Sequence, residues 1–152
     1  MSRIVRLAVG FLLAALALGA CGEGGVSGAQ KEQAERADDI CIDLQEKVGR
    51  ELGDEPEADR DAVRAASDQF MAMNVPSEGE TTWEIFIQST NNLWISLQDI
   101  AQSLDPNVND RARAERARET VDQVHENIRN AADDYGMEVC SEGFTLGSRN
   151  RD

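Results

Sequence analysis

The sequence predicts an all-α protein, an antiparallel up-down-up-down four-helix bundle with one disulfide bond. Beyond Gln30, four segments repeat apolar residues at helical spacing, and no segment alternates with period two for long. The links between these segments are short, which places consecutive helices antiparallel. Cys41 and Cys140 fall near the start of the first helix and just past the fourth, two places that such a bundle brings together. We therefore expect the bundle to span residues 31–140.

The first two helices are predicted from their apolar faces and their ends. The first begins near Gln30 and ends at Gly53, and the second has Pro56 in its first turn and is stopped by Asn74-Val75-Pro76. The inner face of the first helix comprises Ala37, Ile40, Cys41, Leu44, Val48 and Leu52. The inner face of the second comprises Ala58, Ala62, Val63, Ala66, Phe70 and Met73.

The third helix has the clearest apolar stripe and is expected to be the central one. Thr81 and Glu84 have the spacing of a capping box, which predicts where the helix starts. Asp105-Pro106 ends it. Its stripe is Trp83, Phe86, Thr90, Leu93, Leu97, Ile100 and Leu104, widened by Ile87, Trp94 and Ala101.

The fourth helix is predicted from a further stripe and a glycine stop. Gly136 follows the stripe at the place of a left-handed C-cap. The stripe consists of Ala117, Val121, Val124, Ile128, Ala131 and Tyr135. Residues 141–152 are expected to be a frayed tail because Gly143, Gly147 and a polar ending offer little to pack.

The first 20 residues have the pattern of a secretory signal peptide. Arg3 and Arg6 precede Leu7–Leu18, a run of twelve residues without a polar side chain. The run is shorter than the roughly 20 apolar residues of a membrane-spanning helix. We therefore expect residues 1–20 to be removed during export.

The end of this signal, Leu18-Gly19-Ala20-Cys21, resembles the lipobox of bacterial lipoproteins. The resemblance implies cleavage before Cys21, diacylglycerol on its thiol and acylation of the new amino terminus. Paired acyl chains bind a bilayer durably, whereas a single chain does so only marginally. The alternative is an ordinary signal peptide, cleavage of which would release a soluble protein. Residues 21–30 are expected to be a flexible glycine-rich tether that follows the lipidated cysteine.

Charge limits the partners of the exported part. The chain carries 29 acidic and 15 basic residues, a net charge of −14, and the loss of Arg3 and Arg6 with the signal would change this to −16. Such a surface repels nucleic acid and anionic headgroups, so we expect no nucleic-acid partner.

Three cysteines in an exported chain become an even pair once Cys21 is assigned to the lipid. In an oxidising compartment the remaining Cys41 and Cys140 are expected to form a disulfide. Two buried free thiols are the alternative. A catalytic thiol is disfavoured, because the single histidine, His125, lies in a polar helical stretch.

The combination of lipobox, glycine-rich tether, four helices and the terminal Tyr135-Gly136-Met137-Glu138-Val139-Cys140 resembles small helical lipoproteins of high-GC Gram-positive bacteria. The preference for arginine, with Lys31 and Lys47 the only lysines, agrees with a GC-rich genome. The resemblance implies a fold and a location, and it implies no activity.

Large apolar residues are expected at the end of the bundle from which the tether leaves. Interpreted functionally, they form an apolar pocket near the membrane; interpreted structurally, they are a core layer that closes the bundle. The candidate pocket residues are Phe70, Met73, Trp83, Phe86, Tyr135 and Met137.

The opposite end carries four arginines as a candidate partner surface, Arg111, Arg113, Arg116 and Arg118. Arginine forks can bind carboxylate or phosphate groups of a partner. The alternative is a solvated helix surface in which Arg111 pairs with Glu115 and Arg118 with Asp122.

No metal, cofactor or catalytic constellation is predicted. His125 has acidic neighbours, yet one histidine cannot complete a paired Glu-x-x-His site, so a surface histidine is expected. The acidic residues around the first link lack the spacing of an EF-hand. The chain also lacks a phosphate-binding loop, a nucleophile elbow and a zinc-binding histidine pair.

These observations favour a non-enzymatic lipoprotein on the outer face of the cell membrane that binds an envelope protein. The alternatives are a lipoprotein that binds a small molecule or lipid at the apolar end, and a metal carrier centred on His125.

Overall fold

The computed structural model describes residues 27–48 and 53–144. The predictions for the signal peptide, for lipidation of Cys21 and for most of the tether fall outside these residues. The same holds for Leu52 and for the tail from Thr145 onward.

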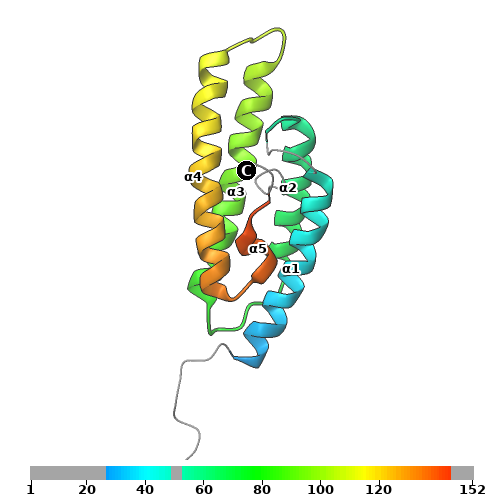
Figure 1. Cartoon of the computed structure of the whole chain (residues 1–152), viewed down its shortest axis with the longest axis vertical. Helices are drawn as coiled ribbons and strands as arrows, with labels where there is room; N and C mark the ends of the chain where they lie inside the picture. Colours follow the sequence, from blue (N-terminus) through cyan, green and yellow to red (C-terminus); the bar gives the residue numbers. More distant parts are fainter. Residues whose placement is uncertain (1–26, 49–52, 145–152) are drawn as a thin grey trace, which may run out of the picture.

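Five helices make up the described part of the chain, which contains no strand. Four are long, α1 (Gly28–Val48), α2 (Pro56–Met71), α3 (Glu80–Leu104) and α4 (Arg111–Tyr135), and the fifth, α5 (Glu138–Glu142), is short. Each long helix packs on the next along the chain, and α5 contacts both α4 and α1 (Figure 1). The prediction of an all-helical protein is confirmed, and α5 is an addition to it.

The core follows α3, the central helix of the prediction. Phe86, Leu93, Leu97 and Ile100 are fully buried along it, between α2 on one side and α4 on the other. Leu104 ends the predicted stripe but is 41% exposed. Leu104 is exposed because the adjoining ends of α3 and α4 project past the start of α2 (Figure 1).

The α1 helix starts earlier than the tether prediction allowed. Gly28 is its first residue, and Ser27 Oγ accepts a hydrogen bond of 3.2 Å from the Gln30 amide. Gln30 in turn donates from Nε2 to the Tyr135 carbonyl at 3.0 Å. A side-chain cap and a tertiary contact therefore order residues 28–30, which the sequence assigned to a flexible segment.

The first turn of α2 presents a different residue to the core than the sequence predicts. Ala58 is exposed, whereas Asp59 is buried. The Asp59 carboxylate accepts a 2.7 Å hydrogen bond from the Gly53 amide, a backbone group in the link before the helix. The polar side chain is placed inside because it binds this backbone donor.

The capping box predicted at Thr81 and Glu84 is wrong. The helix begins at Glu80, its N-cap is Gly79 in the left-handed conformation (φ 89°), and no side chain caps it. A Cβ atom at residue 79 would lie 3.0 Å from Tyr135 Cε2. Close packing of Tyr135 thus requires glycine here and decides where α3 starts.

The ends of α4 agree better with the sequence, but the predicted frayed tail is corrected for residues 141–144. Asp110 caps the start of α4 by accepting from the Arg113 amide at 3.0 Å, and Gly136 (φ 92°) ends the helix as expected. Beyond it, Met137 and Phe144 are buried in the core. The described chain is therefore packed four residues past Cys140.

Candidate functional site

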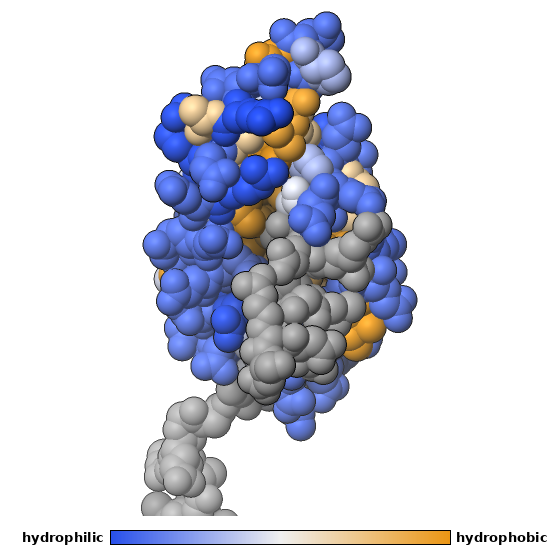
Figure 2. Space-filling view, turned by 45° about the horizontal axis from the view of Figure 1, so that its top comes forward, coloured by the Kyte–Doolittle hydropathy of each residue, from blue (hydrophilic) through white to orange (hydrophobic). Residues whose placement is uncertain are grey.

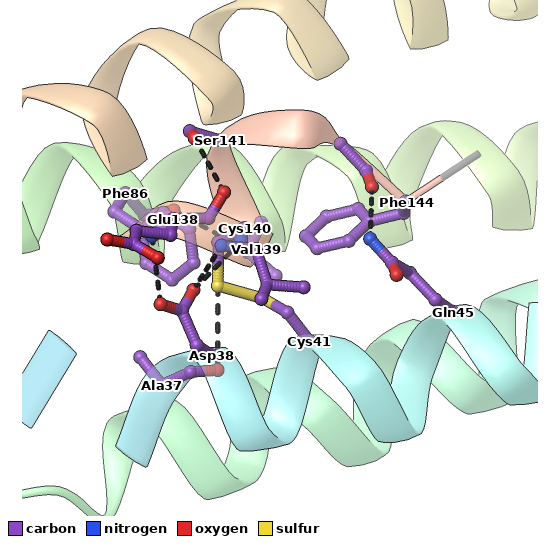
Figure 3. Close-up of a disulfide and its surroundings, with 12 residues drawn as sticks. Ala37, Asp38, Cys41, Gln45, Phe86, Glu138, Val139, Cys140, Ser141 and Phe144 are labelled. Carbon is purple, nitrogen blue, oxygen red and sulfur yellow. Dashed lines mark hydrogen bonds between the residues drawn. A yellow bond between two sulfur atoms is a disulfide. The ribbon is translucent and has the colours of Figure 1, made fainter. Parts of the chain in front are cut away.

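The disulfide and α5 form a fixed connection between the start and the end of the described chain (Figure 3). Cys41 and Cys140 are bonded, with their Cα atoms 5.4 Å apart, which confirms the predicted pairing. Sγ of Cys140 also lies 3.5 Å from the Ala37 carbonyl oxygen, a contact without a proton because a disulfide sulfur has none to donate.

Asp38 adds a second connection that the sequence did not reveal. Its carboxylate accepts hydrogen bonds from the amides of Glu138, Val139 and Cys140, at 2.8, 2.8 and 2.9 Å. These amides are the free donors of the first turn of α5. A residue of α1 therefore caps a helix about 100 positions later, and Figure 3 shows its side chain pointing from α1 at that helix.

The candidate pocket residues do come together. Phe70, Trp83 and Phe86 are in mutual ring contact, with centroids 4.9 to 6.2 Å apart, and Trp83 lies 5.2 Å from Tyr135. These four side chains and Met137 are buried, and Met73 is half-buried against the same core. The described arrangement is a packed aromatic cluster at the end of the molecule where α1 begins.

Several buried polar atoms of the described chain have no hydrogen-bond partner. They are the Tyr135 hydroxyl, the Ser67 hydroxyl and both amide atoms of Gln33. Burial also raises the pKa of Tyr135, so its hydroxyl stays protonated at neutral pH. An unpaired buried polar group costs about 1–3 kcal/mol.

The candidate partner surface lies at the opposite end, on the turn between α3 and α4. Leu104 and Val108 are 41% and 55% exposed there. Arg111, Arg116 and Arg118 are exposed on the adjoining first turns of α4, and Arg113 is half-buried. Figure 2 shows apolar surface near this end, bordered by hydrophilic residues. We call these six residues the hairpin tip.

The ion pairs at the hairpin tip differ from those predicted. Arg113 binds Asp99 of α3 at 2.8 Å, and Arg118 approaches Glu115 at 3.6 Å. The predicted partners, Glu115 for Arg111 and Asp122 for Arg118, are not the ones used. Within the described chain Arg111 and Arg116 form no ion pair, so their guanidinium groups are open to solvent.

His125 is not the surface residue that the sequence suggested. It is half-buried, and Nε2 accepts a hydrogen bond of 2.9 Å from the Phe144 amide. Burial lowers the pKa of His125, the charge of Arg129 lowers it further, and Asp122 opposes both. The single histidine thus accepts a hydrogen bond from a backbone amide.

No three His, Cys, Asp or Glu side chains of residues 27–48 and 53–144 converge as a metal ion would need. In the same residues, no helix combines the length and hydropathy required to cross a membrane.

Comparison with known proteins adds no assignment. No family model, no curated protein and no solved structure shows significant similarity to the chain.

The sequence did not reveal the hydrogen bonds that several polar side chains make with other segments. Asp38 and Asp59 lie among other acidic residues in helices that look solvated from their composition. A weak signal did exist for Asp38, because it precedes Cys41 by one helical turn and so shares its face with the disulfide. No comparable signal marks Gln33 or Ser67.

Proposed function

We propose that the protein is a non-enzymatic lipoprotein, anchored to the outer face of the cell membrane through acyl chains on Cys21, that binds an envelope protein with its hairpin tip. The observation that carries the proposal is the exposure of Leu104 and Val108 beside two arginines without ion pairs. Apolar side chains rimmed by arginine are typical of protein interfaces.

The placement of charge at the start of α4 supports this proposal. The first turn holds Arg111 and Arg113 and no acidic residue. Cations at a helix N-terminus oppose the helix dipole and cost about 0.3–1 kcal/mol each. An acidic partner surface would offset that repulsion. Partner binding would thus account for arginines at a position where they disfavour the helix.

The direction of the chain supports the location. Residue 27 lies at the end of the molecule with the aromatic cluster, because Gln30 bonds to Tyr135. A tether from Cys21 would therefore enter at this end and leave the hairpin tip pointing away from the bilayer. Mass spectrometry of the native protein should detect a diacylglyceryl-modified N-terminal Cys21. An unmodified Cys21, or a chain that begins upstream of it, would contradict the anchor.

We also propose an antiparallel up-down-up-down order for the four long helices. It is supported by the contacts of consecutive helices and by the position of α5 against both α1 and α4. Spin labels at exposed Glu32 and Asp133 should then lie much closer together than labels at Glu32 and Glu115. The reverse order of distances would contradict it.

Site-specific photo-cross-linking in the native host tests the partner surface. A photoreactive amino acid in place of Val108 should give a discrete protein adduct that Arg111→Glu with Arg116→Glu abolishes, because charge reversal repels an acidic partner. The matched control is Lys31→Glu with Arg36→Glu, the same charge change on exposed residues of α1 at the other end. The proposal fails if no discrete adduct forms, or if both variants lose it equally.

A ligand-binding lipoprotein is the second candidate, favoured by the unpaired Tyr135 hydroxyl in the aromatic cluster. Trp94 is a separate tryptophan that stacks under Arg64, so Trp94→Phe would leave Trp83 as the sole reporter. Oleic acid should then shift the Trp83 emission saturably, and Tyr135→Phe should weaken that response. A flat titration would contradict this candidate for a fatty acid and leave the interaction module as the better explanation.

A further inference from the structure

The end of α5 and the segment that follows it are fastened at several points. Phe144 is fully buried, and its amide donates to His125 Nε2 at 2.9 Å. Gln45 Nε2 of α1 donates to the Gly143 carbonyl at 2.7 Å, as Figure 3 shows, and Arg129 Nε donates to the Ser141 carbonyl at 3.1 Å. The segment thus spans from α4 to α1 across the core.

The bond from Phe144 depends on the protonation state of His125. Neutral imidazole can accept a hydrogen bond at one ring nitrogen, whereas imidazolium carries a proton on both. Protonation of Nε2 therefore removes the acceptor and points an N–H group at the Phe144 amide. The two donors repel each other, so the charged ring disfavours the closed arrangement.

The backbone of residue 143 lies close to the imidazole. Gly143 has a φ of +88°, and a Cβ atom on it would lie only 2.6 Å from His125 Nε2. The Phe144 ring lies beside the imidazole, with centroids 5.8 Å apart. The backbone of Gly143 and the Phe144 ring thus lie next to the group whose charge would change.

We propose that residues 143 and 144 form a pH-gated strap, closed over the core while His125 is neutral and released when the imidazole is protonated. Release exposes the Phe144 side chain and the core surface it covers, on the side of the molecule where α5 bridges α1 and α4. The disulfide of Cys140 keeps α5 itself in place, so only the residues beyond it move.

The charged groups around His125 set the pH range over which the strap opens. Arg129 and Asp122 act on it from α4, with opposite signs. Glu142, the last residue of α5, directly precedes the strap. From α1, the uncharged Gln45 binds the strap, and Asp38 accepts hydrogen bonds from α5. Because the pKa of His125 is lowered in the folded protein, the closed strap keeps its full stability above the ordinary histidine value of about 6.5. It loses that stability as the pH falls through the lowered pKa.

Amide hydrogen exchange by NMR tests the strap in the intact, oxidised protein. After correction for intrinsic rates, the protection of the Phe144 amide should fall by up to roughly tenfold per pH unit as the pH is lowered from about 6.5 to the lowered pKa of His125, and it should level off below that pKa. The Val139 amide, which Asp38 holds, is the internal control and should keep its protection. Constant protection of Phe144 across this range would overturn the proposal.

Two variants separate the switch from general destabilisation. His125→Gln keeps an acceptor that does not titrate, so the Phe144 amide should become insensitive to pH. Gln45→Met loosens the strap at every pH but should retain the pH dependence. It should also move the pKa of His125 toward that of a free imidazole, a shift visible in the ring resonances of a protein with the native histidine. An unchanged pKa in Gln45→Met, or an unchanged pH dependence in His125→Gln, would overturn the proposal.

Discussion

Asp38 is the residue whose role depends most on a distant part of the chain. It accepts hydrogen bonds from three amides of α5 and lies one helical turn from the disulfide. A carboxylate that caps a helix is one of the stronger hydrogen-bond acceptors in proteins. Because the hydrogen bonds of Asp38 and the disulfide are separate connections, the contribution of Asp38 to stability can be measured on its own.

We expect Asp38→Ala to lower the free energy of unfolding by about 1–2 kcal/mol, because three backbone donors, two of them partly buried, lose their acceptor. Urea denaturation followed by circular dichroism measures the change. Asp39→Ala, at the exposed neighbouring position, is the control and should stay within about 0.5 kcal/mol of the wild type. Equal effects of the two substitutions would show that the cap contributes nothing specific.

Asp59 makes the stability of the fold depend on pH. Burial raises its pKa, and the hydrogen bonds from the Gly53 and Glu55 backbone only partly oppose that effect. The folded state therefore favours the protonated carboxyl more than the unfolded state does. The resulting stabilisation is complete below the ordinary pKa of 3.8 and is lost as the pH rises through the raised pKa.

Asp59→Asn should gain stability relative to the wild type on going from pH 3 to pH 7, because the amide cannot ionise and can still accept from the Gly53 amide. Urea midpoints measured at both pH values test this. Asp68→Asn, at an exposed position of α2, provides the control and should show no such trend. If the wild type instead became more stable than Asp59→Asn as the pH rises, the raised pKa of Asp59 would be contradicted.

At the scale of elements, α3 carries the core because it packs between α2 and α4 and contributes a row of fully buried apolar side chains. Leu97 lies fully buried in its middle, and Ile95, two positions away, is exposed. The two side chains have similar size and opposite environments, which makes them a matched pair.

Leu97→Ala should cost about 2–5 kcal/mol, since it removes buried methyl groups and leaves a cavity, whereas Ile95→Ala should cost less than about 0.5 kcal/mol. Thermal and urea unfolding of both variants gives the comparison. Equal costs would mean that the wrong face of α3 is buried.

The α5 helix shows why some elements escape sequence-based prediction. Five residues are too few to form a stable helix alone, because nucleation is unfavourable. The segment is helical where Asp38 supplies its N-terminal cap and Cys41 fixes its position. Its own residues contain no periodic pattern to read.

At the scale of the molecule, the disulfide joins residues 99 positions apart and so ties the end of the described chain to α1. A native disulfide constrains the unfolded chain and typically contributes about 2–5 kcal/mol.

Cys41→Ala with Cys140→Ala should lower the free energy of unfolding by about 2–5 kcal/mol while the helical circular dichroism spectrum is kept, because Asp38 still caps α5. The wild type measured with a reducing agent should approach the variant, and the variant itself should not respond to that agent. Equal stability of the wild type and the variant would show that the bond adds nothing to the fold.

The sequence by itself determined the helical class, the approximate extent of the four long helices, the central position of α3 and the Cys41–Cys140 pair. These features follow from periodicity, helix-ending residues and the number of cysteines, which are local or countable properties. Only the tertiary structure decided the start of α3 at Gly79, the buried Asp59, the exposed Leu104, the cap from Asp38 and the packing of Phe144 against His125. Each of these depends on a backbone donor, a ring or an empty space that lies outside the helix concerned. The pattern of neighbouring residues therefore does not reveal them, apart from the one-turn spacing of Asp38 and Cys41.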